Sequence, residues 1–198
     1  MRDPYEPQLH RIRTKIHEAQ RIGWRARSGQ RHFGVAEHEL RWASPLEEAT
    51  VAEFEVRHGI EFPADYRAFL TRVSACRAGP FAGLLPLGHG LVFSAPDGFL
   101  AEASPLVPGV DYGPRWDEDL SIADEPLRGI FIIADQACGE MCGLVVCGKA
   151  RGRVVYVGNG PPFFVKERTF LDWYEHWLAD LIADRPTTSF GYPSLETP

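Results

Sequence analysis

The chain has 198 residues, of which 44% are hydrophobic and 12% aromatic, which is enough for a buried core and excludes a disordered chain. The formal charge is −6 at pH 7 and is unevenly distributed. Residues 1–43 hold nine basic and five acidic residues, whereas the remainder holds twelve basic and twenty-two acidic ones. An acidic body repels nucleic acid and anionic membranes, so we expect neither as a partner and expect a basic protein instead.

The N-terminal segment, residues 1–43, predicts an amphipathic helix followed by an irregular connector. The helix is expected over 6–22, because apolar residues recur there at helical spacing and Gly23 can end it. The residues of this apolar stripe are Leu9, Ile12, Ile16 and Ala19. Glycines and polar residues follow, so we expect the connector over 24–43, with a short strand near 38–42.

The next segment predicts two helices joined by a tight link. Ser44 is a suitable N-cap, Pro45 suits the first helical position, and Glu47 stands at the capping-box position. Gly59 ends this helix because glycine readily adopts the left-handed conformation, and Pro63 begins the second helix. The expected core-facing residues are Leu46, Val51, Phe54, Tyr66, Phe69, Leu70 and Val73.

After residue 75, frequent glycine and proline exclude long helices and favour short strands. The expected strands are 91–94, 130–134, 143–147, 153–157 and 163–165. Residues 148–152 form a hairpin loop between two of them. The stretch between Ser94 and Leu127 predicts a long loop over the sheet, and loops of this length are usually functional.

The chain then predicts a closing helix, with Thr169 as its N-cap, Asp172 three residues later and Pro186 beyond its end. Its buried stripe is Phe170, Trp173, Trp177, Leu178 and Leu181. Helices, then antiparallel strands, then a helix indicate an α+β fold, a single domain with a mainly antiparallel twisted sheet flanked by helices. We expect three parts: an N-terminal helix and connector over 1–43, the α+β domain over 44–183, and a flexible tail over 184–198.

Neither a signal peptide nor an apolar run long enough to cross a bilayer is seen in the sequence, so a cytoplasmic location is expected. In that compartment the four cysteines should be thiols. Cys138, Cys142 and Cys147 lie within ten residues, but their gaps of three and four residues do not match a zinc knuckle. We interpret them as ordinary thiols, with a metal or redox site as the alternative, and expect no cofactor or metal.

No motif for catalysis stands out, so no catalytic residue is assigned. The sequence has no G-x-S-x-G elbow, no P-loop and no G-x-G-x-x-G phosphate-binding turn. His58 precedes a helix-ending glycine, where a cation favours the helix dipole. The sequence therefore favours a binding protein over an enzyme.

The loop that follows residue 110 is the candidate partner-binding site. Aromatic side chains there offer contact area, and carboxylates can steer a basic partner toward them. The candidate residues are Tyr112, Trp116, Asp117, Glu118 and Asp119. The alternative is a surface loop in which Trp116 simply packs on the sheet.

The pattern from Val51 to Leu70, VAEFEVRHGIEFPADYRAFL, resembles the signature of the SUKH superfamily, in its Smi/Knr type. The matching residues are Phe54, Glu55, Gly59, Pro63, Asp65, Tyr66, Phe69 and Leu70. Weaker similarity extends over roughly residues 40–182. The chain departs from the family where Ser74-Ala75-Cys76 replaces an asparagine-glycine-glycine turn, and where Glu140 replaces an aspartate.

This resemblance implies an α+β sheet whose concave face binds another protein. Bacterial members are similar to immunity proteins that neutralise the toxins of neighbouring cells, and fungal relatives are scaffolds in cell-wall signalling. The resemblance thus implies a non-enzymatic protein that binds a cognate toxin, as a monomer or weak dimer. A regulatory scaffold of the same fold and a cysteine-dependent metalloprotein or enzyme remain the alternatives.

Overall fold

The structure is a computed structural model that describes residues 3–29, 31–89, 98–113, 127–136, 139–158 and 160–186. Its centre is an antiparallel sheet of four strands that follow one another in chain order. The strands are β1 (Ile130–Asp135), β2 (Met141–Val145), β3 (Val154–Val157) and β4 (Phe163–Phe164). The expected antiparallel α+β fold is confirmed. The strand expected at 91–94 lies outside the described residues.

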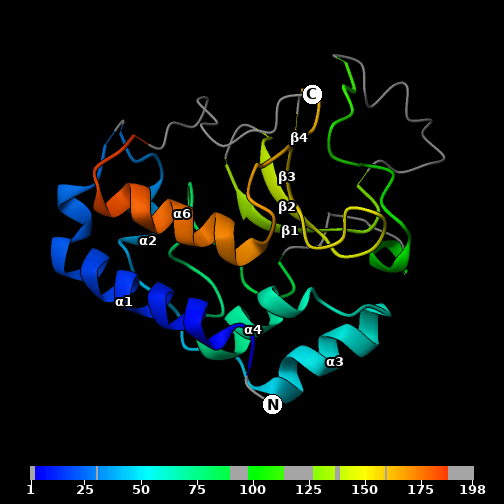
Figure 1. Ribbon diagram of the computed structural model, residues 1–198, viewed down its shortest axis with the longest axis horizontal. Coiled ribbons are helices and arrows are strands. Elements are labelled where there is room, and N and C mark those ends of the chain that lie inside the picture. Colours follow the sequence, from blue (N-terminus) through cyan, green and yellow to red (C-terminus); the bar gives the residue numbers. More distant parts are fainter. Residues whose placement is uncertain are drawn as a thin grey trace.

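Helices cover one face of this sheet (Figure 1). The described helices are α1 (Glu6–Ile22), α2 (Val35–His38), α3 (Glu48–His58), α4 (Ala64–Arg72) and α6 (Phe170–Ile182), with 3-10 turns at Trp24–Ala26 and Phe99–Ala101. The helices expected over 6–22 and from Pro63 onward are confirmed. Gly59, in the left-handed conformation at φ 65°, ends α3 as expected.

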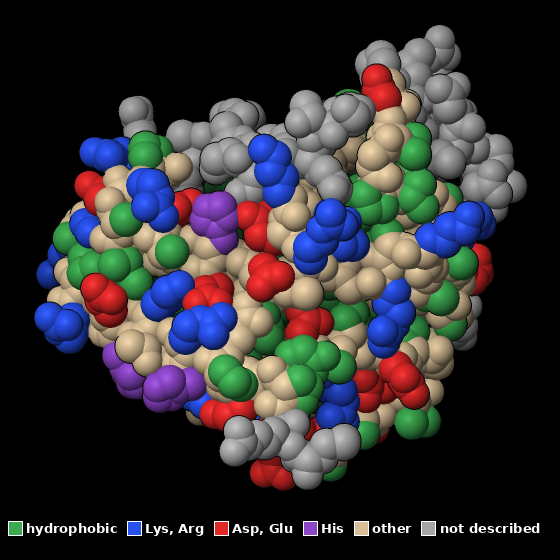
Figure 2. Space-filling model, in the orientation of Figure 1, with side chains coloured by type: hydrophobic (Ala, Val, Ile, Leu, Met, Phe, Trp, Pro, Cys, Tyr) green, Lys and Arg blue, Asp and Glu red, His purple; other side chains and the backbone are tan. Residues whose placement is uncertain are grey.

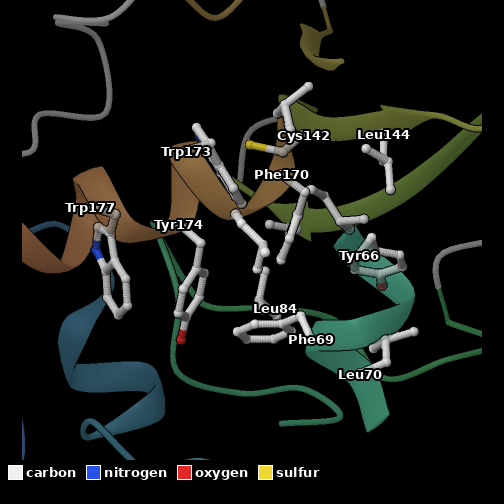
Figure 3. Close-up of a cluster of buried hydrophobic side chains, with 14 of the residues drawn as sticks. Tyr66, Phe69, Leu70, Leu84, Cys142, Leu144, Phe170, Trp173, Tyr174 and Trp177 are labelled. Atoms are coloured by element: carbon white, nitrogen blue, oxygen red, sulfur yellow. The ribbon is translucent and has the colours of Figure 1, made fainter. Parts of the chain in front are cut away.

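The main core lies between α4, α6 and the sheet, and it is largely aromatic (Figure 3). Tyr66 of α4 meets Phe170 of α6 with 4.7 Å between ring centroids, and Phe69 meets Tyr174 at 4.6 Å, both edge to face. Cys142 and Leu144 of β2 line the sheet side of the same cluster. Burial of such rings, together with their edge-to-face geometry, makes this cluster the main source of stability.

The residues of the sequence signature hold this core in place. Asp65 on α4 accepts a hydrogen bond from the backbone N–H of Leu171 at the start of α6, 3.2 Å away. Thr169 caps the same helix end by accepting from the Asp172 N–H, as its sequence position predicts. Glu55 accepts from the Phe62 N–H at 2.8 Å and so ties down the link between α3 and α4. The acidic residues of the signature therefore satisfy backbone donors that would otherwise be unpaired.

The N-terminal segment packs on the outer side of α6, where α1 and α6 lie side by side (Figure 1). The expected stripe of α1 is buried and belongs to the main core. Glu175 of α6 joins the two helices by accepting hydrogen bonds from Gln8, Arg11 and Lys15 at 2.9 to 3.1 Å. Arg27 of the connector donates to the carbonyls of Leu181 and Ile182 and satisfies the C-terminal end of α6.

Two local predictions are wrong. Ser44 does not cap α3, which begins four residues later after Glu47 and has no side-chain cap. Residues 44–46 are instead held by longer-range backbone bonds, from Leu46 N–H to the Leu70 carbonyl and from Ala75 N–H to the Ser44 carbonyl. The short strand expected near 38–42 is also wrong, because α2 ends at His38 and only Trp42 forms a bridge, to Arg77.

The other face of the sheet carries a second, smaller cluster that includes Ile130, Val145, Val155 and Phe164. Gly143 lies within this face, between Ile132 and Val155 in the strand register. A Cβ atom on Gly143 would lie 2.3 Å from Cγ2 of Ile130 and 3.5 Å from Cγ1 of Val155. The missing side chain of Gly143 thus makes the space that Ile130 fills.

We predict that Gly143→Ala lowers the free energy of unfolding by about 1–3 kcal/mol, because Ile130 is fully buried and has nowhere to move. Urea denaturation followed by circular dichroism measures this. Gly160→Ala is the matched control, since a Cβ there meets nothing within 4 Å. Equal stability of the two variants would contradict this packing.

A second prediction concerns Glu175. Its burial works against ionisation, but hydrogen bonds from Arg11, Lys15 and Gln8 outweigh burial and lower the pKa of Glu175 below its usual 4.5. Its contribution is therefore present above pH 4.5 and is lost as the pH falls through the lowered pKa. We expect Glu175→Gln to cost about 1 kcal/mol of unfolding free energy at pH 7 and less at pH 3.5.

Thermal melts at the two pH values measure this difference. Glu53→Gln is the control, because the Glu53–Arg57 pair on α3 is mostly exposed and should contribute about 0.5 kcal/mol or less. A cost for Glu175→Gln that does not change with pH would show that the charge of Glu175 does not stabilise the contact.

Candidate protein-binding surface

The candidate partner-binding loop is described up to residue 113, so Tyr112 can be placed. Tyr112 is half-buried and packs against the smaller cluster, on the sheet face away from the helices. Its hydroxyl accepts a hydrogen bond from the Val107 N–H at 2.6 Å and donates to the Val107 carbonyl at 3.3 Å. Trp116, Asp117, Glu118 and Asp119 lie outside the described residues, so their role stays a prediction.

Tyr112 also lines a small surface pocket at the β4 edge of the sheet. We call this region the Tyr112 surface; it consists of Gly109, Val110, Asp111, Tyr112, Pro161, Pro162, Phe163 and Phe164. Two segments about fifty residues apart in the chain therefore build one surface. Strand β4 places Phe163 and Phe164 there, because it pairs with β3 through Val155 and Tyr156.

The Tyr112 surface is unusual in showing large apolar side chains to solvent. Val110 is 47% exposed and Phe163 37% exposed, and they are two of the four large hydrophobic residues that are exposed in the described parts of the chain. The others, Phe33 and Val56, lie elsewhere, in the connector and on α3. Two exposed apolar residues beside an aromatic ring are typical of the centre of a protein-binding site.

The sequence alone does not identify four members of this surface, Val110, Pro161, Pro162 and Phe163. The sequence predicts Phe163 only as part of the strand expected at 163–165. The available signal was the Pro-Pro-Phe-Phe run itself, since two prolines cannot donate to a neighbouring strand and so mark an edge. Their proximity to Val110 could come only from the fold.

The charge on the molecular surface is mixed where it can be seen. Lys, Arg, Asp and Glu side chains alternate over the face shown in Figure 2, without a region of one sign. On the Tyr112 surface itself, Asp111 is the one charged residue among those described. The dense acidic stretch of the sequence, between 111 and 125, falls mostly outside the described residues.

The cysteines that can be placed lie in different environments. Cys142 is fully buried, takes a hydrogen bond from the Gln136 amide at 3.0 Å, and has a pKa raised well above the usual value by burial. Cys147 is half-buried and its thiol donates to the Ala101 carbonyl. Within the described ranges, no group of three or more His, Cys, Asp and Glu side chains could hold a metal ion.

Among the helices of the described residues, none is long and apolar enough to span a membrane. His58, at the end of α3, packs its ring on Phe54 with 4.3 Å between the ring centroids. It therefore contributes to packing at the rim of the core.

We predict that Tyr112→Phe loosens the loop that carries Val110. Loss of both hydrogen bonds to Val107 should cost about 1 kcal/mol of unfolding free energy and speed amide exchange at Val107. Differential scanning calorimetry and hydrogen exchange measure the two effects. Tyr5→Phe is the control, because the Tyr5 hydroxyl forms no hydrogen bond with any described residue, and it should change neither.

Comparison with known proteins identifies a family. A search of curated proteins gives no significant match, and a search of solved structures gives none either. The model of the SMI1 / KNR4 family (SUKH-1) matches residues 45–176, two thirds of the chain, from just before α3 into α6. The N-terminal segment with α1 and α2 precedes the matched region. The chain therefore belongs to the SMI1 / KNR4 family (SUKH-1).

Proposed function

We propose that the protein is an immunity protein that neutralises a cognate bacterial toxin in the cytoplasm by binding it stoichiometrically, without turnover. Membership of the SMI1 / KNR4 family (SUKH-1) carries this proposal, because the signature helices and the sheet both lie inside the matched region. The mechanism is occlusion: the bound protein covers the part of the toxin that acts on the cell.

The Tyr112 surface supplies the contact in this proposal. Val110 and Phe163 offer apolar area that a partner can bury, and Tyr112 is held in place by its two hydrogen bonds to Val107. Preformed aromatic and aliphatic anchors lower the entropic cost of association, because few side chains have to be ordered when the partner arrives.

Charge supports a basic partner. Residues 44–198 hold twenty-two acidic and twelve basic residues, and six of the acids lie between 111 and 125, next to the Tyr112 surface in sequence. Such an acidic excess accelerates encounter with a positively charged protein. The electrostatic attraction behind this effect weakens as the salt concentration rises. A toxin that acts on nucleic acid would carry the complementary charge.

The proposal is tested with the polypeptide encoded next to this protein. Co-expression should protect cells from that polypeptide, and the purified pair should form a complex of defined stoichiometry in calorimetry. Protection without binding, or neither binding nor protection with any adjacent toxin, would overturn it. Binding to a host protein alone would instead indicate a regulatory scaffold.

We predict that Val110→Asp weakens binding of that polypeptide at least tenfold, which corresponds to about 1.4 kcal/mol, because a buried carboxylate would face apolar partner atoms. Titration calorimetry measures the change in Kd. Val56→Asp is the control: Val56 is 84% exposed on α3, outside the Tyr112 surface, and should leave Kd unchanged. Equal effects of the two substitutions would place the contact elsewhere.

A further inference from the structure

His38 is the last residue of α2 and lies inside the molecule, with 6% of its surface exposed. Its Nδ1 accepts a hydrogen bond from the backbone N–H of Leu40 at 3.1 Å. A ring nitrogen that accepts a hydrogen bond carries no proton, so this contact requires a neutral imidazole with its proton on Nε2, which is buried without a hydrogen-bond partner among the described residues. Protonation of Nδ1 would remove the bond.

The bond closes a turn that is strained. Glu39 and Leu40 both have φ of 51°, in the left-handed region that residues with a side chain rarely adopt, and they follow one another directly. The Leu40 N–H is buried in this turn and has His38 as its acceptor. The imidazole therefore offsets part of the strain of the turn.

The surroundings of His38 are apolar or backbone. The ring centroids of His38 and Trp177, on α6, are 6.1 Å apart, in an edge-to-face arrangement. Cδ2 of His38 lies 3.2 Å from the point where a Cβ atom on Gly83 would stand. The charged or titratable residues adjacent in sequence to His38 or to its neighbours are Glu37 and Glu39 on its own segment, Arg77 before Gly79, and His176 and Asp180 beside Trp177 on α6. None of them forms a hydrogen bond or ion pair with the imidazole among the described residues.

The position of His38 links two parts of the protein. Residues 24–44 join α1 to the family domain, precede the region matched by the family, and run past the C-terminal end of α6. His38 is the point at which this connector reaches Trp177 inside the core. A change at His38 therefore acts on the contact between the connector and α6.

We propose that His38 is a proton-sensitive latch: its neutral imidazole keeps the turn at Glu39 and Leu40 closed against α6, and protonation releases residues 31–44 from that helix. The released turn relaxes to negative φ, and the imidazolium moves to water. This inference does not depend on the proposed function or on the identity of a partner.

The burial of His38 supports a latch that opens as the pH falls. Desolvation, only partly opposed by the Gly79 backbone, lowers the pKa of His38 from 6.5 to about 4. The closed form thus binds the proton more weakly than the open form. Closure is fully stable above pH 6.5 and is lost progressively as the pH falls from 6.5 toward 4.

His32 is a second buried histidine of the connector and has a different partner. Nε2 of His32 lies 2.9 Å from Oδ1 of Asp184, and Arg27 and Arg31 also approach that carboxylate. His32 therefore faces a carboxylate, whereas His38 faces a backbone N–H. The test must therefore separate His38 from His32.

The test is hydrogen exchange of the full-length protein at pH 7.5 and pH 5, corrected for the intrinsic effect of pH. In the wild type, we expect protection of backbone amides in 31–44 to fall roughly tenfold or more at pH 5, relative to amides of β2. His38→Asn keeps an acceptor near the Leu40 N–H but cannot titrate, so this pH-dependent loss should disappear.

His10→Asn on the exposed face of α1 is the control and should behave as the wild type does, whereas His32→Asn should keep the loss or increase it. The same loss in His38→Asn as in the wild type would overturn the proposal. If His38→Asn does not fold, the proposal is tested instead by an NMR titration of the His38 imidazole in the wild-type protein. Titration of His38 below pH 5 supports the latch, and titration at or above pH 6.5 overturns it.

Discussion

The burial of helix α6 is the constraint on which the rest of the structure depends. Its aromatic side chains, Phe170 and Tyr174 among them, pack on α4 and the sheet, while α1 covers its outer side. The end groups of a helix need hydrogen-bond partners, and both ends of α6 have them within the protein. Asp65 and Thr169 supply acceptors at the first turn, and Arg27 supplies donors at the last.

This arrangement gives the sheet two differently packed sides. The helical side is occupied by the protein's own N-terminal segment, whose apolar stripe is buried and whose cations surround Glu175. Within the described ranges, the opposite side of the sheet carries the smaller cluster, with Val110 and Phe163 exposed at the β4 edge. A partner gains most by burying apolar area that folding has left uncovered, which favours the second side.

The predictions from the sequence agree with the structure where the interactions involved are local in the chain, and fail where they are long-range. The helices at 6–22 and 170–182 were predictable, because apolar spacing and local caps depend on residues within a few positions of each other. Ser44 failed as a cap although its local signals are strong. Backbone hydrogen bonds from Ala75 N–H to the Ser44 carbonyl and from Leu46 N–H to the Leu70 carbonyl hold this segment, and no local pattern reports such long-range bonds.

The sequence alone determined the fold class and the family signature, and from the aromatic and acidic composition of its loop it predicted Tyr112 as a site residue. Only the tertiary structure decided that Val110 and Phe163 share a surface with it and that His38 contacts α6. The physical reason is that side-chain periodicity encodes which face of an element is buried, whereas the pairing of distant faces is settled by packing the whole chain at once.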